Sequence, residues 1–192
     1  MALKSTIYRA ALSVANIAQN RYGDYALTIA RHPSETDERM MVRLLAFALH
    51  ANDALCFGKG LSTEDEPDLW RRDLTGAIEL WIDVGLPDEK QVRKACGRAG
   101  EVHIYAYGGR AVGLWWSKAR DRLDALPRLT VSEVPIDASR ALAAMAARSM
   151  RLHCTIQDGS IDFGDSATSV SVELADLKSS HMQMQSAHRT GR

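Results

Sequence analysis

The sequence has few cysteines, few aromatic residues and no long apolar run. Its 192 residues include 3 Cys, and Phe, Trp and Tyr together make up 6%. The cysteines are widely spaced and lack a CxxC pair, so we expect reduced thiols rather than disulfides or a structural zinc site. No stretch approaches the roughly 18 consecutive apolar residues of a membrane-spanning helix. The polar N-terminal segment does not resemble a secretory signal, so we expect a cytoplasmic protein without a membrane partner.

An excess of charge of either sign is also missing. The 24 Lys and Arg residues balance 24 Asp and Glu residues, which excludes a chain held to nucleic acid by bulk charge. The charges are nevertheless unevenly distributed. Residues 1–84 carry 9 basic and 12 acidic side chains, whereas residues 85–128 carry 9 basic and 5 acidic ones. The length and the 46% hydrophobic content are typical of one globular domain.

Hydrophobic periodicity predicts an α/β domain. Alternation predicts antiparallel strands over 3–15 and 22–31. A helix is predicted from an N-cap at Ser34 to about residue 50, with a polar face that includes Arg39 and Arg43. Further helices are predicted over 87–99, 112–125 and 137–149, and further strands near 56–57, 68 and 79 and over 101–109, 129–134, 151–157, 160–163 and 168–174. We expect one domain over 1–177, with a mixed sheet flanked by helices, and a disordered tail over 178–192.

Carboxylates gather before residue 84. If the chain reverses near Asp73–Leu74, Asp68 and Glu79 lie directly opposite each other, with Cβ atoms about 4.5–5.5 Å apart. Two carboxylates this close repel each other unless a proton or a cation intervenes, and hard oxygen ligands suit Mg²⁺ or Mn²⁺. Glu38, at the inner edge of the first helical turn, is available as a third acid. The alternative is that each acid forms an ordinary ion pair with a surface Lys or Arg.

Seven sequence blocks closely resemble those of the YaeQ family of bacterial proteins. They extend in order to about residue 176 and read ALKSTIYRA, ARHPSETDERMMVRLLAFAL, GLSTEDEPDLW, GAIELWIDVGLPDEKQVRKACGRA, YAYGGRA, LWW and TIQDG. The resemblance implies a variant of the PD-(D/E)XK phosphodiesterase fold of restriction and repair nucleases. Its restriction-endonuclease-like αβββαβ core would carry additional N- and C-terminal strands.

The resemblance also implies metal ligands. In such nucleases the Asp of a PD dipeptide and the acid of an ExK motif bind magnesium, and a Glu on the first helix often joins them. These positions correspond here to Asp68, Glu79 and Glu38, with Mg²⁺ or Mn²⁺ as the cofactor. The sequence departs from the pattern at Trp81, which stands where ExK has its lysine.

Some members of this superfamily supply the missing lysine from the second helix. Lys90 and Lys94 are the candidates here, and we select Lys94 as the catalytic lysine. A helical wheel places both lysines opposite the buried stripe of that helix, which weakens this assignment. Arg93 and Arg110 are expected to contact the substrate phosphate.

Three functions are compatible with these features. The first is a Mg²⁺- or Mn²⁺-dependent phosphodiester hydrolase acting on nucleic acid, with Asp68, Glu79 and Lys94 as catalytic residues. The second, motivated by the absent ExK lysine, is a catalytically degenerate member that binds nucleic acid or a protein through residues 85–128. The third is an enzyme that uses the same acids on a small phosphorylated substrate.

Overall fold

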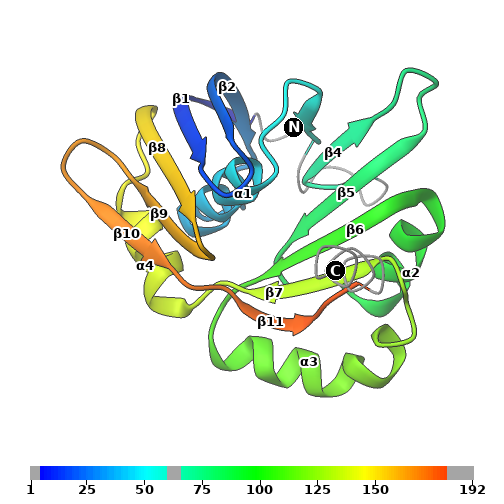
Figure 1. Ribbon diagram of the computed structural model, residues 1–192. Coiled ribbons are helices and arrows are strands. Elements are labelled where there is room, and N and C mark those ends of the chain that lie inside the picture. Colours follow the sequence, from blue (N-terminus) through cyan, green and yellow to red (C-terminus); the bar gives the residue numbers. More distant parts are fainter. Residues whose placement is uncertain (1–4, 60–65, 181–192) are drawn as a thin grey trace, which may run out of the picture.

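The computed structural model describes residues 5–59 and 66–180, and these ranges form two β-sheets and four helices (Figure 1). In chain order the elements are β1 (Thr6–Asn16), β2 (Arg21–Arg31), α1 (Asp37–Leu49), β3 (Leu55–Phe57), β4 (Leu69–Arg72), β5 (Ile78–Val84), α2 (Glu89–Arg98), β6 (Ala99–Ala106), α3 (Arg110–Leu123), β7 (Leu129–Glu133), α4 (Ile136–Ala144), β8 (Ser149–Gln157), β9 (Ser160–Gly164), β10 (Ser169–Val172) and β11 (Ala175–Lys178). No helix in the described ranges is long and apolar enough to cross a bilayer.

The sequence predicts one mixed sheet, and the structure has two. The first has the strand order β10-β9-β8-β1-β2, and the second has the order β11-β7-β6-β5-β4-β3. The N-terminal hairpin joins the C-terminal strands because β1 pairs in parallel with β8, so that Arg9 lies opposite Ser149. In the second sheet β5, β6 and β7 are parallel, whereas β3, β4 and β11 pair in the antiparallel sense. Alternation along a strand predicts its faces but not its partner, which explains the difference.

Helix α1 lies between the two sheets, and α2 and α3 cover the other face of the second sheet (Figure 1). One apolar cluster joins α1 to the inner faces of both sheets, including Leu12 from β1 and Ile82 from β5. A second cluster joins α2 and α3 to Trp81 and Ile104 on the opposite face of the second sheet. The second sheet is therefore covered on both faces, as is typical of parallel strands.

Helix α1 is buried on almost every side. All residues from Met40 to Ala48 are buried. The prediction of a polar face is therefore wrong at Arg43, which is 0% exposed. The predicted N-cap is also displaced, because the side chain of Thr36, not that of Ser34, accepts the hydrogen bond from the Arg39 N–H at 3.1 Å.

The β4–β5 turn is longer than predicted. The Oδ1 atom of Asp73 accepts hydrogen bonds from the N–H groups of Thr75 at 2.8 Å and Ala77 at 3.0 Å, and Gly76 has a φ of 88°. The reversal therefore centres near Thr75 rather than at Asp73–Leu74. Leu69 consequently pairs with Ile82, four positions from the predicted register.

Two further boundaries differ from the sequence prediction. Helix α2 begins after Asp88, whose side chain accepts from the Gln91 N–H at 2.9 Å, so Pro87 precedes the cap. Strand β11 was not predicted. It ends at Lys178, and Ser180 is 2% exposed, so the folded part extends beyond the predicted boundary at 177. The remainder of the predicted tail, 181–192, lies outside the described residues.

The backbone at Gly58, directly after β3, packs closely against the segment that precedes β4. Its N–H donates to the carbonyl oxygen of Asp68 at 2.9 Å, and a Cβ at this position would lie 1.9 Å from the Pro67 carbonyl oxygen. We expect Gly58→Ala to lower the free energy of unfolding by about 2 kcal/mol or more, because backbone must move. Gly97→Ala, in α2 with open space around its Cβ, should raise it by about 0.5–1 kcal/mol. Urea unfolding of both variants measures these changes, and equal effects would contradict the packing described for β3.

Candidate functional site

Asp68 is a buried carboxylate whose two oxygens are both hydrogen-bonded. It directly precedes β4, and its side chain is 5% exposed. The Nη2 atom of Arg39 donates to Oδ1 and Oδ2 at 2.8 Å each, and the Val84 N–H donates to Oδ2 at 2.8 Å. Burial of this charge is therefore offset by a guanidinium group and by the backbone of β5.

A second buried carboxylate, that of Glu35, shares the same arginine. Its Oε1 atom accepts from Nη1 of Arg39 and from Nη1 of Arg43, each at 3.0 Å. Its Oε2 atom accepts from Arg43 at 3.1 Å and from the His32 N–H at 3.3 Å. The side chains of Glu35 and Arg43 are 0% exposed. Glu35, Arg39, Arg43 and Asp68 thus form a buried Arg–carboxylate network with no net formal charge.

The sequence prediction missed three members of this network. Arg39 and Arg43 are four residues apart and lie along one side of α1, and Glu35, four residues before Arg39, directly precedes the N-cap of that helix. An arginine in the middle of an apolar helix, with a second arginine four residues before it and a glutamate eight residues before it, is the signal that could have revealed them.

Asp83 lies beside Asp68 because Leu69 and Ile82 are paired in the β4–β5 ladder. Its Oδ2 atom accepts from Nε1 of Trp81 at 2.9 Å, and its carboxylate also accepts from the backbone N–H of Asp68. Burial, together with the smaller effect of the negative charge of Asp68, raises the pKa of Asp83 to about 7. Asp83 therefore changes its charge near neutral pH.

The two aspartates lie at the carboxyl end of the parallel strands. Strand β5 ends at Val84, which pairs with Tyr105 near the end of β6. The chain after β6 turns through Gly108 and Gly109, which both have positive φ, and enters α3 at Arg110. In open α/β sheets, ligands commonly bind outside the carboxyl ends of the strands. Asp68 and Asp83 therefore occupy the part of this fold where a ligand site is expected.

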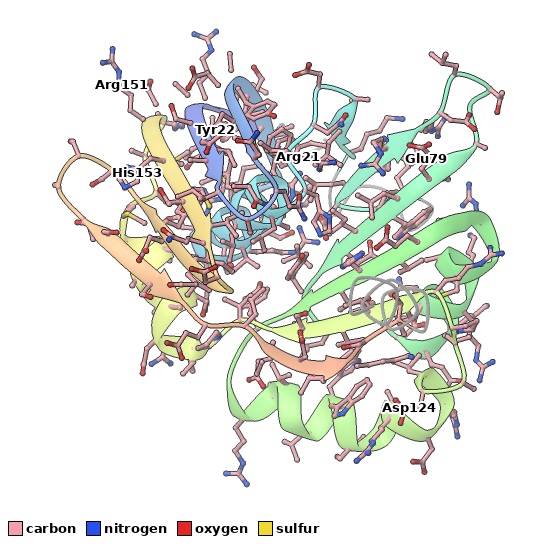
Figure 2. All side chains as sticks on the ribbon, viewed as in Figure 1. Arg21, Tyr22, Glu79, Asp124, Arg151 and His153 are labelled. Atoms are coloured by element: carbon pink, nitrogen blue, oxygen red, sulfur yellow. The ribbon has the colours of Figure 1, made fainter. Side chains whose placement is uncertain are left out.

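The structure does not bring Glu79 or Glu38 to Asp68. The predicted register is wrong, and Glu79 lies toward the turn of the β4–β5 hairpin, where its carboxylate pairs with Nε of Arg71 at 2.9 Å (Figure 2). Its side chain is 48% exposed. Glu38 instead accepts a hydrogen bond from Oγ of Ser139 in α4 at 2.6 Å. Of the three predicted ligands, only Asp68 is at the site.

The basic candidates lie on the helices that follow β5 and β6. Lys94 and Arg93 are exposed residues of α2, and Nε of Arg93 donates to Glu89 at 2.8 Å. Helix α2 packs against the face of β5 that carries Trp81, and alternation puts Asp83 on that same face. Lys94 thus belongs to the helix adjacent to Asp83. Arg110 is exposed in the first turn of α3.

Two histidines that are distant in sequence also meet between α1 and β6. The rings of His50 and His103 have centroids 4.5 Å apart, and Nε2 of His50 lies 2.7 Å from the Tyr105 hydroxyl. Burial lowers the pKa of His50 to about 3, with a further contribution from His103. Nε2 of His103 lies 2.7 Å from Glu101. Across 5–59 and 66–180, no set of three or more His, Cys, Asp or Glu side chains has the geometry of a preformed metal site.

The pKa of Asp83 predicts a specific pH dependence. Because this pKa rises from 3.8 to about 7 on folding, the folded protein binds more protons than the unfolded chain between these values. The free energy of unfolding should therefore fall as pH rises through this window, by at most about 1.4 kcal/mol per pH unit from this group. Asp83→Asn should remove that contribution, so the variant should gain stability relative to the wild type between pH 5 and pH 8. A ¹³C NMR titration of the Asp83 carboxyl tests the cause directly, and a midpoint near 4 would contradict it.

The Arg–carboxylate network predicts a large stability effect at Glu35. Glu35→Gln leaves two buried guanidinium groups with one carboxylate fewer, so we expect a loss of about 3–5 kcal/mol in the free energy of unfolding. Glu79→Gln removes a surface ion pair and should cost about 1 kcal/mol or less. Denaturant unfolding of the two variants measures both, and a comparable small loss at the two positions would show that the network contributes little to stability.

Comparisons with known proteins agree with the sequence blocks. The family model described as YaeQ protein matches residues 1–174. Relatives named "Uncharacterized protein YaeQ" from Salmonella typhi and Escherichia coli (strain K12) are 45% and 43% identical over 174 residues, covering 91% of this chain and 96% of each relative. The crystal structure of the YaeQ protein from Xanthomonas axonopodis pv. citri matches with a TM-score of 0.88 and 47% identity over 91% of this chain and 99% of that one. That from Pseudomonas syringae matches with a TM-score of 0.87 and 35% identity over 91% of this chain and 97% of that one. The chain therefore belongs to the YaeQ family.

Proposed function

We propose that this protein is a metal-dependent phosphodiester hydrolase acting on nucleic acid, a variant of the PD-(D/E)XK superfamily. The observation that carries the proposal is the pair formed by Asp68 and Asp83 at the carboxyl end of β5. The element order α1-β3-β4-β5-α2-β6 corresponds to the αβββαβ order of that superfamily, and Pro67–Asp68 corresponds to its PD dipeptide. In this proposal Asp83 replaces Glu79 as the second acid.

The chemistry of the two aspartates fits a hard divalent cation. A carboxylate offers about four lone-pair positions, and Asp83 uses two of them for hydrogen bonds from Trp81 and Asp68. Its raised pKa reflects burial and the nearby negative charge of Asp68, which together outweigh the opposing effect of Arg39. Mg²⁺ and Mn²⁺ bind through one or two carboxylates together with water and substrate phosphates, so two acids are enough.

The residues of this chain would divide the remaining tasks. Asp68 and Asp83 would hold the cation, which supplies an activated water and offsets charge on the scissile phosphate. Lys94, on the helix that covers the Asp83 face, would contact the phosphate or the attacking water. Arg110, at the start of α3, is exposed at the same end of the sheet and would contact the nucleic acid backbone.

One observation favours a second candidate, a member of the family that binds nucleic acid or a protein without cleaving it. Arg39 already occupies both oxygens of Asp68, and a guanidinium group can replace a metal ion as the counter-charge. The basic segment 85–128 would then be the contact surface. Binding that weakens steeply with salt, without product formation in Mg²⁺ or Mn²⁺, is the expected behaviour of this alternative.

The first proposal is tested by calorimetric titration of Mn²⁺ into the wild type, Asp83→Asn and Glu79→Gln. We expect heat of binding in the wild type and in Glu79→Gln and its loss in Asp83→Asn, because only Asp83 adjoins Asp68. The affinity should increase from pH 6 to pH 8 as Asp83 loses its proton. Labelled DNA and RNA, single- and double-stranded, are then screened for cleavage with Mn²⁺.

The outcomes separate the candidate sites. Loss of binding in Glu79→Gln but not in Asp83→Asn would restore the acid pair that the sequence predicted and contradict the pair proposed here. Binding of nucleic acid with no Mn²⁺ heat and no cleavage in any protein would favour the non-catalytic alternative.

A further inference from the structure

The contacts of Asp68 raise a question that the proposed hydrolase must answer. Arg39 donates to both oxygens of Asp68 from one nitrogen, so a cation and Arg39 compete for the same lone pairs. Their positive charges also repel each other across the carboxylate. A metal ion can bind Asp68 closely only if Arg39 moves away from it.

The two arginines of the network differ in their freedom to move. The side chain of Arg39 is 15% exposed and lies in the first turn of α1. The side chain of Arg43 is 0% exposed, lies one turn further along α1 than Arg39, and has its guanidinium carbon 5.2 Å from the centre of the Phe57 ring. Arg39 can therefore turn toward solvent, whereas Arg43 cannot.

Arg43 has hydrogen-bonding capacity that the described arrangement leaves unused. Its Nη1 atom bonds to Glu35, but its buried Nε and Nη2 atoms have no hydrogen-bond partner among the described residues. The Nε atom lies 3.5 Å from Oδ1 of Asp68, the oxygen that Arg39 occupies at 2.8 Å. Unsatisfied buried donors are costly, and departure of Arg39 would open this oxygen to Arg43.

The charge of the site indicates what draws Arg39 away. The Arg–carboxylate network is neutral, so ionised Asp83 leaves one negative charge and a divalent cation then leaves one positive charge. A phosphodiester group carries the single negative charge that restores neutrality. The planar guanidinium of Arg39 is well suited to phosphate oxygens, which it can bind through two nitrogens at once.

We propose that Arg39 exchanges Asp68 for a phosphate of the bound phosphodiester, and that Arg43 then bonds to Oδ1 of Asp68 and leaves Oδ2 accessible to the metal ion. Arg39 is thus a phosphate-binding residue that weakens metal binding at Asp68 until substrate arrives. This inference rests on the proposed function. Its consequence is that metal and nucleic acid bind cooperatively, with Arg39 as the residue that couples them.

The coupling is measured by titrating Mn²⁺ with and without a phosphorothioate-linked oligonucleotide, as single strand and as duplex. In the wild type we expect the oligonucleotide to raise the Mn²⁺ affinity by about 5- to 150-fold. An uncharged methylphosphonate-linked oligonucleotide should not raise it. Arg39→Gln should bind Mn²⁺ alone more tightly than the wild type, and the oligonucleotide should then change its affinity by about twofold or less, because Asp68 is already accessible.

Arg151→Gln is the matched control, since it removes one exposed arginine from β8 in the other sheet (Figure 2). This variant should keep the wild-type coupling. Equal coupling in Arg39→Gln and the wild type, with Mn²⁺ binding still lost in Asp83→Asn, would overturn the role of Arg39 and leave the proposed function intact. Absence of Mn²⁺ binding to the wild type, with and without oligonucleotide, would overturn both.

An NMR measurement on the wild type avoids any loss of folding in Arg39→Gln. The Nε–H signal of Arg43 should shift downfield when Mg²⁺ and the phosphorothioate oligonucleotide are added together, because Nε gains a hydrogen bond to Asp68. An unchanged Arg43 signal under saturating conditions would overturn the exchange.

Discussion

The buried Arg–carboxylate network is the constraint on which the rest of the structure depends. Glu35 and Asp68 come from segments on either side of β3, and the arginines of α1 join them in the space between the two sheets. Such a network stabilises a fold only when its members remain paired, because an isolated buried charge is strongly unfavourable. It therefore fixes how α1 docks on β4 and β5, and with that the position of Asp68 beside Asp83.

The same contacts produce the chemistry of the site. Arg39 and the Val84 N–H hold the Asp68 carboxylate in place, and burial, followed by the nearby charge of Asp68, raises the pKa of Asp83 to about 7. A buried acid whose pKa is raised by burial and by a neighbouring charge is typical of functional sites. Arg39 is partly exposed and has room to move, whereas Arg43 is fully buried and is held in place. Structural stability and the proposed metal chemistry draw on a single group of side chains.

Local patterns predicted most elements but not their mutual arrangement. Alternation correctly identified the β1–β2 hairpin, and apolar spacing identified α1. The predicted pairing of Asp68 with Glu79 is wrong because it depended on the position of a single turn, the one between β4 and β5. Asp73 accepts three hydrogen bonds within that turn and extends it, which moves Asp83 rather than Glu79 beside Asp68. Side chains alternate between the faces of a strand, so register errors change which residues meet even when every strand is correctly located.

The sequence by itself determined the family, the α/β class and the helix that precedes three strands, and it named Asp68 as a candidate ligand. These depend on motifs and on periodicities that act over a few residues. Only the tertiary structure decided that there are two sheets, that Arg43 is buried inside an apolar helix, and that Glu35 and Asp83 complete the acidic centre. The physical reason is that pairing of distant charges and burial of polar groups follow from the packing of the whole chain. A helical wheel treats arginine as a solvent-facing residue, whereas this fold supplies two carboxylates that hold it in the interior.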